Sequence, residues 1–386
     1  MLEFFVRFGE LGLKSPPVRR YMEIRLAENI RSILKKIDIE KPDVKINRSW
    51  GRLIITLEAP SDESEKEQII EKIQSTVSNF VMGVTSISLV HRTSCKIEDI
   101  GNVALALAKK VLKPNSTFAV RARRVGTHNY TSKDLERLIG EVIFEALKDE
   151  LNLSVNLTEP MTKISIEVRD NFAFIFSEKH ESQGGLPQGT QGTIAAILRG
   201  SIEDAIASFL LCKRGAIVSP IAFVYTNGEF ENNKTAINEQ LRLFEFIQPR
   251  KANYHYIVDF SKILNEVTMS RLQCSTCDKI CLKIAEIIMQ DKMIGGISFG
   301  NASTTLMDRI PEKGFQNNIP IYYPLLALNK EKIKHPFNTN YKSEFCLSSC
   351  LGFENQKKKE IKPLSNKEIS LIAANANFQL IKPTKS

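Results

Sequence analysis

Between residues 194 and 299 the chain alternates short, nearly continuous apolar runs with segments of helical periodicity, and this pattern constrains the fold most. The apolar runs cover 194–198, 216–225, 254–260 and 293–299. Helical patterns lie between them at 203–213 and 274–289. Strands that are apolar along their whole length are typical of a parallel sheet with helices on both faces. The second half is therefore predicted to be an α/β domain.

The first half predicts smaller α/β units. Strands are expected at 2–8, 43–46, 52–57 and 117–123, helices at 18–36, 65–80 and 133–149, and a hairpin at 163–177 that turns at Asp170-Asn171. Thr131 and Ser132 stand where a helix needs capping oxygens, and Asp134 suits its first turn. With 386 residues, two or three domains are expected. The predicted boundaries are 1–80, 81–180 and 181–386, with a glycine-rich linker or close-approach loop at 181–193 and a basic tail at 357–386 that carries a short helical pattern at 367–375.

Composition narrows the class of partner and the compartment. The net charge of +9 raises the odds of a polyanionic partner without proving one. No apolar run reaches the roughly 20 residues of a membrane span, and the first residues lack the pattern of a signal peptide, so a cytoplasmic protein without a membrane partner is expected.

Two basic clusters are candidate anion-binding sites. Arg121 and Arg123 share one face of the expected strand at 117–123, Arg124 follows, and Gly126 and His128 allow close approach of a ligand. A solvated strand edge is an equally good interpretation from spacing alone. Lys14, Arg19, Arg20 and Arg25 surround the start of the first helix, where a helix N-terminus attracts anions. For any one of these four residues, a solvated side chain is the better interpretation.

The cysteines form a second kind of candidate site. Cys274, Cys277 and Cys281 could share one helix face, and Cys346 and Cys350 lie downstream. Thiolates three residues apart suit zinc, an iron–sulfur cluster or a redox dithiol. A buried cysteine is commonly a small apolar residue, but the second pair shifts the balance toward a metal site.

A loop between the strand at 194–198 and the helix at 203–213 is a third candidate. Its residues are Arg199, Gly200, Ser201, Ile202, Glu203 and Asp204. Backbone N–H groups at such a turn can cradle a phosphate. An ordinary turn in which Ser201 caps the helix is favoured from the residues alone, because two carboxylates would repel phosphate unless a metal ion intervened.

Ordered along the chain, these segments resemble the tRNA 4-thiouridine synthetase (tRNA sulfurtransferase) family in its short archaeal-type form, which lacks a rhodanese domain. The resemblance runs to about residue 353, and the stretch from Gly184 to Gly192 is its most specific part. The other matching segments are residues 6–15, 18–20, 26–30, 118–126, 166–170, 213–215 and 324–325.

The resemblance implies an N-terminal ferredoxin-like α+β domain, a THUMP domain and a C-terminal Rossmann-like PP-loop ATPase fold. It implies tRNA held by the first two domains through Lys14, Arg19, Arg20, Arg121, Arg123, Arg124 and His128. ATP and magnesium would serve adenylation of a uridine, followed by sulfur transfer. An iron–sulfur cluster, with zinc as the alternative, would be held by Cys274, Cys277 and Cys350, with Cys346 as alternate ligand. A homodimer and a sulfur-donor protein are further implied partners.

One segment departs from the family pattern. The family's ATP loop reads Ser-Gly-Gly-x-Asp-Ser-Pro, whereas residues 199–205 here read Arg-Gly-Ser-Ile-Glu-Asp-Ala. Ser201 replaces the second glycine, which lets backbone approach pyrophosphate, and Arg199 replaces the first serine. The downstream Gly-Glu-Ser segment is also altered, at residues 297–303. The alternative prediction is therefore a tRNA-binding relative that has lost ATP-dependent adenylation through a degenerate PP-loop.

Overall fold

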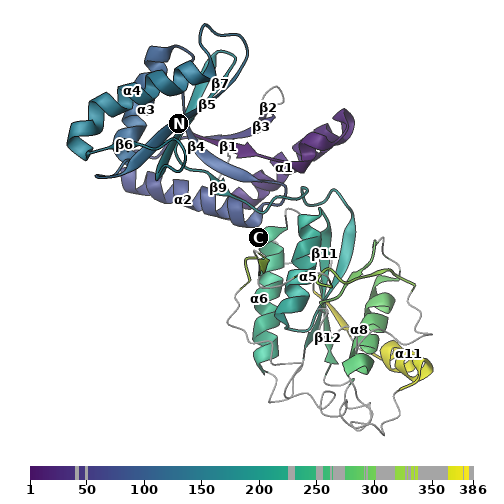
Figure 1. The fold of residues 1–386 in the computed structure, drawn as a ribbon. Coiled ribbons are helices and arrows are strands. Elements are labelled where there is room, and N and C mark those ends of the chain that lie inside the picture. Colours follow the sequence, from purple (N-terminus) through teal and green to yellow (C-terminus); the bar gives the residue numbers. More distant parts are fainter. Residues whose placement is uncertain are drawn as a thin grey trace. The chain divides into compact units, whose positions relative to one another are not determined.

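The computed structural model (Figure 1) shows two compact units. Unit 1 comprises Met1–Lys14, Ile37–Ser78 and Val84–Gly184, and unit 2 comprises Ser15–Lys36, Asn79–Gly83 and Gly185–Ser386. The residues that the structure describes are 1–39, 43–47, 51–224, 231–248, 255–260, 263, 274–290, 292, 294–300, 318–326, 328, 332–333, 335–337, 364–376 and 378–381.

Unit 1 is built on one nine-stranded sheet. Its order is β2-β3-β1-β4-β8-β7-β5-β6, and β9 pairs with β4. The strands are β1 (Leu2–Arg7), β2 (Asp43–Asn47), β3 (Arg52–Leu57), β4 (Ser86–Ser94), β5 (Thr117–Val125), β6 (Ser154–Val155), β7 (Thr162–Arg169), β8 (Phe172–Phe176) and β9 (His180–Glu181). Strand β4 joins the two halves of the sheet, because it pairs with β1 on one side and with β8 on the other.

Helices cover one face of the β5–β8 half of this sheet. The helices of unit 1 are α2 (Glu63–Phe80, whose last two residues belong to unit 2), α3 (Ile97–Val111) and α4 (Ser132–Leu151). Ile100 of α3 and Ile139 of α4 share a buried core with Val120 and Ile166 of the sheet. Thr131 begins α4 with a capping box to Asp134, as the sequence predicts.

Unit 2 contains a six-stranded sheet in the order β14-β13-β10-β11-β12-β15. The strands are β10 (Thr193–Leu198), β11 (Ile217–Val224), β12 (His255–Asp259), β13 (Ile297–Ser298), β14 (Ile321–Tyr322) and β15 (Phe378–Ile381). All neighbouring pairs are parallel except β12 with β15. The predicted parallel sheet is confirmed, with one antiparallel edge strand.

Helices pack on both faces of this sheet. They are α5 (Ile202–Lys213), α6 (Glu231–Ile247), α8 (Cys274–Met289) and α11 (Asn366–Ala374), and α1 (Pro16–Lys35) also belongs to unit 2. Alternate residues of β10 enter two cores: Ala195 and Ile197 pack with α8 and α11, and Ala196 and Leu198 with α5 and α6. This alternation is why β10 is apolar along its length.

Several elements differ from the sequence prediction. The helices α3 and α6 and the strands β4 and β15 were among the elements not predicted, and the strand expected at 293–299 pairs only at Ile297 and Ser298. Gly295 and Gly296 precede that pair, and glycine disfavours a long regular strand. No helix in the described part of the chain is long and apolar enough to cross a membrane.

The second half of the glycine-rich segment 181–193 is a loop whose backbone lies close to the backbone of residues 213–215. Leu186 N–H donates to the Lys213 carbonyl, and Gly189 N–H donates to the Gly215 carbonyl. A Cβ on Gly185 would lie 2.0 Å from the Lys213 oxygen, and Gly185 has a φ of +79°. Only glycine fits there without moving the backbone. The segment therefore holds the loop after α5, where the resemblance to the family is also strong.

Candidate functional site

The candidate nucleotide loop joins the end of β10 to the start of α5. Gly200 has a φ of +90°, and the Ser201 hydroxyl accepts from the Asp204 N–H, so Ser201 is the N-cap of α5. This is the ordinary capping turn that the residues alone favoured. Asp204 sits in the first turn, where its carboxylate suits the helix dipole.

Arg199 lies in this loop and binds two carboxylates, Asp204 on α5 and Asp278 on α8. Its Nε and Nη2 donate to the two Asp204 carboxylate oxygens at 2.9 and 2.8 Å, and its Nη1 donates to Asp278 Oδ1 at 2.6 Å. The side chains of Arg199, Asp204 and Asp278 are 7% exposed or less. These three residues are called the Arg199 triad below. A guanidinium fork on a carboxylate is the stronger kind of charge-assisted hydrogen bond.

The surroundings of the Arg199 triad are close-packed. The guanidinium carbon lies 4.3 Å from the centre of the Phe299 ring, and the Gly300 N–H donates to Asp204 Oδ1 at 3.1 Å. Burial raises the pKa of the nearby Tyr323 hydroxyl, and the Asp278 charge raises it further while Arg199 opposes this. A Cβ on Gly300 would lie 2.4 Å from the Asp204 nitrogen. Gly300 therefore has a packing role at the segment that replaces the family's Gly-Glu-Ser.

Asp278 connects the loop to the cysteine helix. It follows Cys277 directly on α8, which begins at Cys274. Cys277 is partly exposed and Cys281 is buried. Cys346 and Cys350 lie outside the described residues, and the side chain of Cys274 is not described either. Among the described residues no group of three or more metal-ligating side chains comes together.

A pocket beside Gly200 is small. It has a volume of about 180 Å³ and is lined by Ile202, Ala236, Gln240 and Phe337, among others. Ligand pockets for drug-sized molecules are usually about 300–1,000 Å³. This pocket, as the described residues line it, is smaller than that range.

The predicted basic cluster of unit 1 lies along β5 and the loop after it. Arg123 is exposed, and Arg124 Nη1 donates to the Gly126 carbonyl at 2.9 Å. Arg121 reaches the Leu157 carbonyl at the edge of the sheet. His128 Nε2 lies 2.7 Å from the Asp170 carbonyl, which fixes the ring beside Gly126. The arginines and His128 are thus arranged along one strand end and its loop.

The other predicted basic cluster, at the start of α1, has Lys14 in unit 1 and its three arginines in unit 2. Lys14 and Arg20 are exposed, in unit 1 and unit 2 respectively. Arg19 pairs with Glu23 at 2.8 Å, and Arg25 pairs with Glu28 at 2.9 Å. Glu23 and Glu28 on α1 therefore neutralise Arg19 and Arg25. These ion pairs alone would account for both arginines without a bound anion.

Family models match most of the chain in three successive parts. They are a ThiI ferredoxin-like domain at residues 3–88, a THUMP domain at residues 95–178 and the thiamine biosynthesis protein (ThiI) at residues 189–339. The N-terminal ferredoxin-like domain, the THUMP domain and the C-terminal parallel-sheet domain expected from the resemblance are confirmed. These domains define a protein of the class that combines a THUMP module with a PP-loop-type α/β domain.

Relatives identify the family. A probable tRNA sulfurtransferase of Methanosarcina mazei is 30% identical over 342 residues, which cover 85% of this chain and 80% of that protein. A probable tRNA sulfurtransferase of Methanocaldococcus jannaschii is 27% identical over 349 residues, which cover 86% of each chain. The chain belongs to the tRNA sulfurtransferase family.

Solved structures agree with this fold. A crystal structure of a Pyrococcus horikoshii protein matches with a TM-score of 0.58 and 25% identity, over 86% of this chain and 96% of that one. A 4-thiouridine synthetase crystallised with RNA and bound ATP matches with a TM-score of 0.68 and 20% identity, over 99% of this chain and 100% of that chain. The second likeness concerns the fold alone.

Proposed function

We propose that this protein binds tRNA and acts in tRNA uridine thiolation by ATP-dependent adenylation and sulfur transfer. The observation that carries the proposal is the succession of all three family domains along one chain, with relatives named tRNA sulfurtransferase. The exposed Arg123, with Arg121, Arg124 and His128 along the same strand end, supplies a surface suited to phosphate oxygens. The domain boundaries at 80 and 180, the cytoplasmic location, the homodimer and the sulfur-donor protein stay predictions.

The adenylation step requires Arg199 to change partners. Its guanidinium is at the N-terminus of α5, where phosphates bind in strand–loop–helix sites. The triphosphate of Mg-ATP would have to displace Asp204 or Asp278 from the fork. Because that exchange breaks buried ion pairs, apparent ATP affinity is reduced by the fraction of molecules in which the Arg199 triad is closed. Glu203 and Asp204 carry carboxylates that could face magnesium.

The cysteine helix is proposed to hold an iron–sulfur cluster, with zinc as the alternative. Cys274 and Cys277 occupy the first turn of α8, three residues apart, a spacing that suits thiolate ligands of a cluster or of zinc. This donor chemistry fits a cluster, with Cys350 as the third ligand and Cys346 as the alternate. When bound, the cluster would supply the sulfur-carrying chemistry. Asp278 and Arg199 would then connect that helix to the nucleotide loop.

A cluster is tested on anaerobically purified protein by its visible absorbance. Cys274→Ser is expected to abolish this absorbance, and Cys95→Ser, which alters a cysteine of unit 1, is expected to preserve it. Full absorbance in Cys274→Ser would remove Cys274 from the ligand set. Colourless protein that contains stoichiometric zinc would favour the zinc alternative.

A second candidate function is favoured by the Arg199 triad. If the triad does not open, the chain is a tRNA-binding relative that has lost adenylation. Arg199 is nearly completely buried, and its guanidinium already forms ion pairs with two carboxylates of the protein, Asp204 and Asp278. The departures at Arg199 and Ser201 from the family loop point the same way.

Thiolation in vitro separates the two candidates. Unmodified tRNA, Mg-ATP and inorganic sulfide are incubated with the protein, and 4-thiouridine is measured in the digested tRNA. Product that depends on ATP supports the first candidate. Retained tRNA binding without product supports the second. Asp278→Asn, which weakens the Arg199 triad without removing Arg199, serves as the matched variant: it is expected to increase product if triad opening limits ATP binding.

A further inference from the structure

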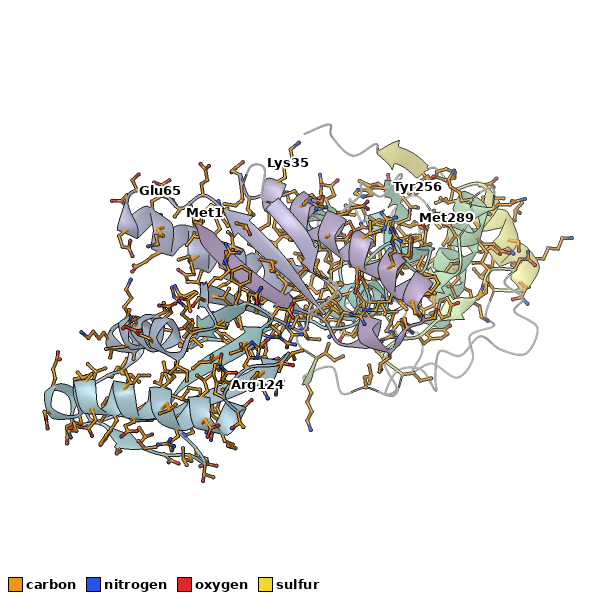
Figure 2. All side chains as sticks on the ribbon, turned by 90° about the horizontal axis from the view of Figure 1, so that it is seen from above. Met1, Lys35, Glu65, Arg124, Tyr256 and Met289 are labelled. Carbon is orange, nitrogen blue, oxygen red and sulfur yellow. The ribbon has the colours of Figure 1, made fainter. Side chains whose placement is uncertain are left out.

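Several arginines lie on one face of the sheet of unit 1. They include Arg7 on β1, Arg52 on β3, Arg123 on β5 and Arg169 on β7. Ala122 and Val168, which directly precede Arg123 and Arg169, point to the opposite face, into the core beneath α3 and α4. Because side chains alternate along a strand, Arg123 and Arg169 face away from those helices. The pairing of β1 with β4, of β4 with β8 and of β8 with β7 continues this assignment to Arg7. Figure 1 shows these strands, and Figure 2 labels Arg124, which follows Arg123 on β5.

Three of these arginines converge on one carboxylate. Glu167 Oε1 is 3.5 Å from Arg7 Nη2, and Glu167 Oε2 is 3.4 Å from Arg52 Nη2 and 3.2 Å from Arg169 Nη2. The strands β4 and β8 lie between β1 and β7, so the sheet must curve around this face for Arg7 to reach Glu167. Burial opposes ionisation of Glu167, but Arg52, Arg7 and Arg169 outweigh it and lower its pKa.

The charges of this cluster do not balance. Three guanidinium groups face one carboxylate, and their side chains are only 11–17% exposed. Burial lowers the pKa of Arg7; the Glu167 charge opposes this shift, while Arg52 and Arg123 add to it. The Nε atoms of Arg52 and Arg169 are buried and have no hydrogen-bond partner among the described residues. A buried donor without a partner costs free energy.

An oxyanion would supply both the missing negative charge and acceptors for the two Nε atoms. An Nε and an Nη of one guanidinium form the fork that binds two oxygens of a phosphate. The three side chains keep 11–17% of their surface exposed, so a phosphate can approach from solvent, and a rotation of Arg52 or Arg169 turns its Nε toward the anion. The exposed Arg123, whose Cα is paired with that of Glu167, extends the positive face outward.

We propose that Arg7, Arg52 and Arg169 form a binding site for one phosphate group of the tRNA backbone. This proposal rests on the proposed tRNA binding. Arg7, held by Ser88 Oγ at 2.9 Å and against the Phe176 ring at 4.8 Å, is the fixed member. Arg52 and Arg169 are the members that turn to the phosphate. Glu167 keeps the three cations together when no phosphate is bound.

Inorganic phosphate is the first probe, because its binding does not depend on tRNA. The thermal midpoint of the full chain is measured against phosphate concentration, with chloride at equal ionic strength as the reference. Saturable stabilisation by phosphate is expected for the wild type, weakened in Arg52→Lys and absent in Arg52→Gln and Arg169→Gln. Stabilisation that is the same in all four proteins would overturn the site.

Glu167→Gln distinguishes an anion site from a purely structural ion network. The substitution keeps the shape and removes the competing negative charge, so phosphate is expected to bind several-fold more tightly. A network without a ligand would lose stability and gain no affinity for phosphate. That result would overturn the proposal even if the arginine variants fold poorly.

tRNA is the second probe. Arg52→Gln is expected to weaken tRNA binding and to reduce the slope of log K against log salt by about one. An unchanged slope, together with phosphate binding that depends on Arg52, would mean a site for free phosphate and would overturn the RNA assignment. If no variant or wild-type protein binds tRNA, the proposed function fails, whereas the phosphate titration still reports on the site.

Discussion

Arg199 Nη1 lies 2.6 Å from Asp278 Oδ1, and this contact connects the loop after β10 to the helix that begins at Cys274. The two residues are 79 positions apart in the sequence, and the same guanidinium is bidentate to Asp204. A single buried side chain thus joins the candidate nucleotide loop and the candidate cluster helix. A change in conformation or ligand binding at the loop is therefore expected to affect the helix, and the reverse.

Breaking the Arg199 triad is expected to destabilise the protein. Arg199→Met leaves the Asp204 and Asp278 carboxylates buried without their cation, which typically costs about 3–5 kcal/mol. Asp278→Asn keeps the bidentate pair with Asp204 and should cost less. Urea unfolding measures both, with Lys234→Met, an exposed change on α6, as control. A loss in Arg199→Met no larger than in the control would show that the ion pairs contribute little.

Glycine is required at position 185 but not equally at 184. Both residues have positive φ, +67° at Gly184 and +79° at Gly185, but no atom within 4 Å would meet a Cβ on Gly184. Gly184→Ala should therefore cost only the backbone strain, about 1–2 kcal/mol. Gly185→Ala adds a clash with the Lys213 carbonyl and should cost clearly more. Equal free energies of unfolding for the two variants would contradict this packing.

Stability is expected to fall below about pH 6.5 because of two histidines, the buried His255 and the partly buried His91. Burial lowers the pKa of His255 and of His91 below the ordinary value of 6.5; Lys110 and Lys66 add to the shift at His91, whereas Glu245 opposes it at His255. The unfolded chain then binds more protons than the folded chain. The free energy of unfolding is constant above 6.5 and falls as pH drops through the lowered pKa values. His255→Gln should make the fall shallower, and an unchanged pH profile would remove His255 from this account.

The arginines of β5 and its loop are expected to contact tRNA. Replacing Arg121, Arg123 and Arg124 with alanine should weaken binding by more than tenfold at low salt and flatten its salt dependence, because each phosphate contact releases counterions. Lys72, Lys109 and Lys113, all exposed elsewhere in unit 1, form the matched triple alanine control. If the control loses as much affinity, the effect is one of net charge and not of this surface.

Local patterns predicted most of the fold, and long-range pairing explains what they missed. The capping box at Thr131 and the apolar run of β10 are visible within a few residues of sequence. The strand β15 could not be foreseen, because its place at the sheet edge depends on pairing with β12, more than a hundred residues earlier. The same reason hid the role of Asp278: nothing near it in the sequence indicates Arg199 as its partner.

The candidate sites were predicted unevenly. Arg199 was identified through its departure from the family loop, although its binding by two carboxylates was not. The cluster of Arg7, Arg52 and Arg169 was missed entirely, since single arginines on three separate strands give no local signal. The ligand set at Cys274, Cys277, Cys346 and Cys350 stays a prediction.

Equilibrium binding of Mg-ATP to the full chain, with and without unmodified tRNA, tests the central claim most directly. The account predicts saturable ATP binding in the presence of tRNA, weakened by Arg199→Lys, which keeps the charge but loses the fork. No ATP binding by protein that still holds tRNA would contradict it, and would leave a tRNA-binding protein whose Arg199 triad has closed the nucleotide loop.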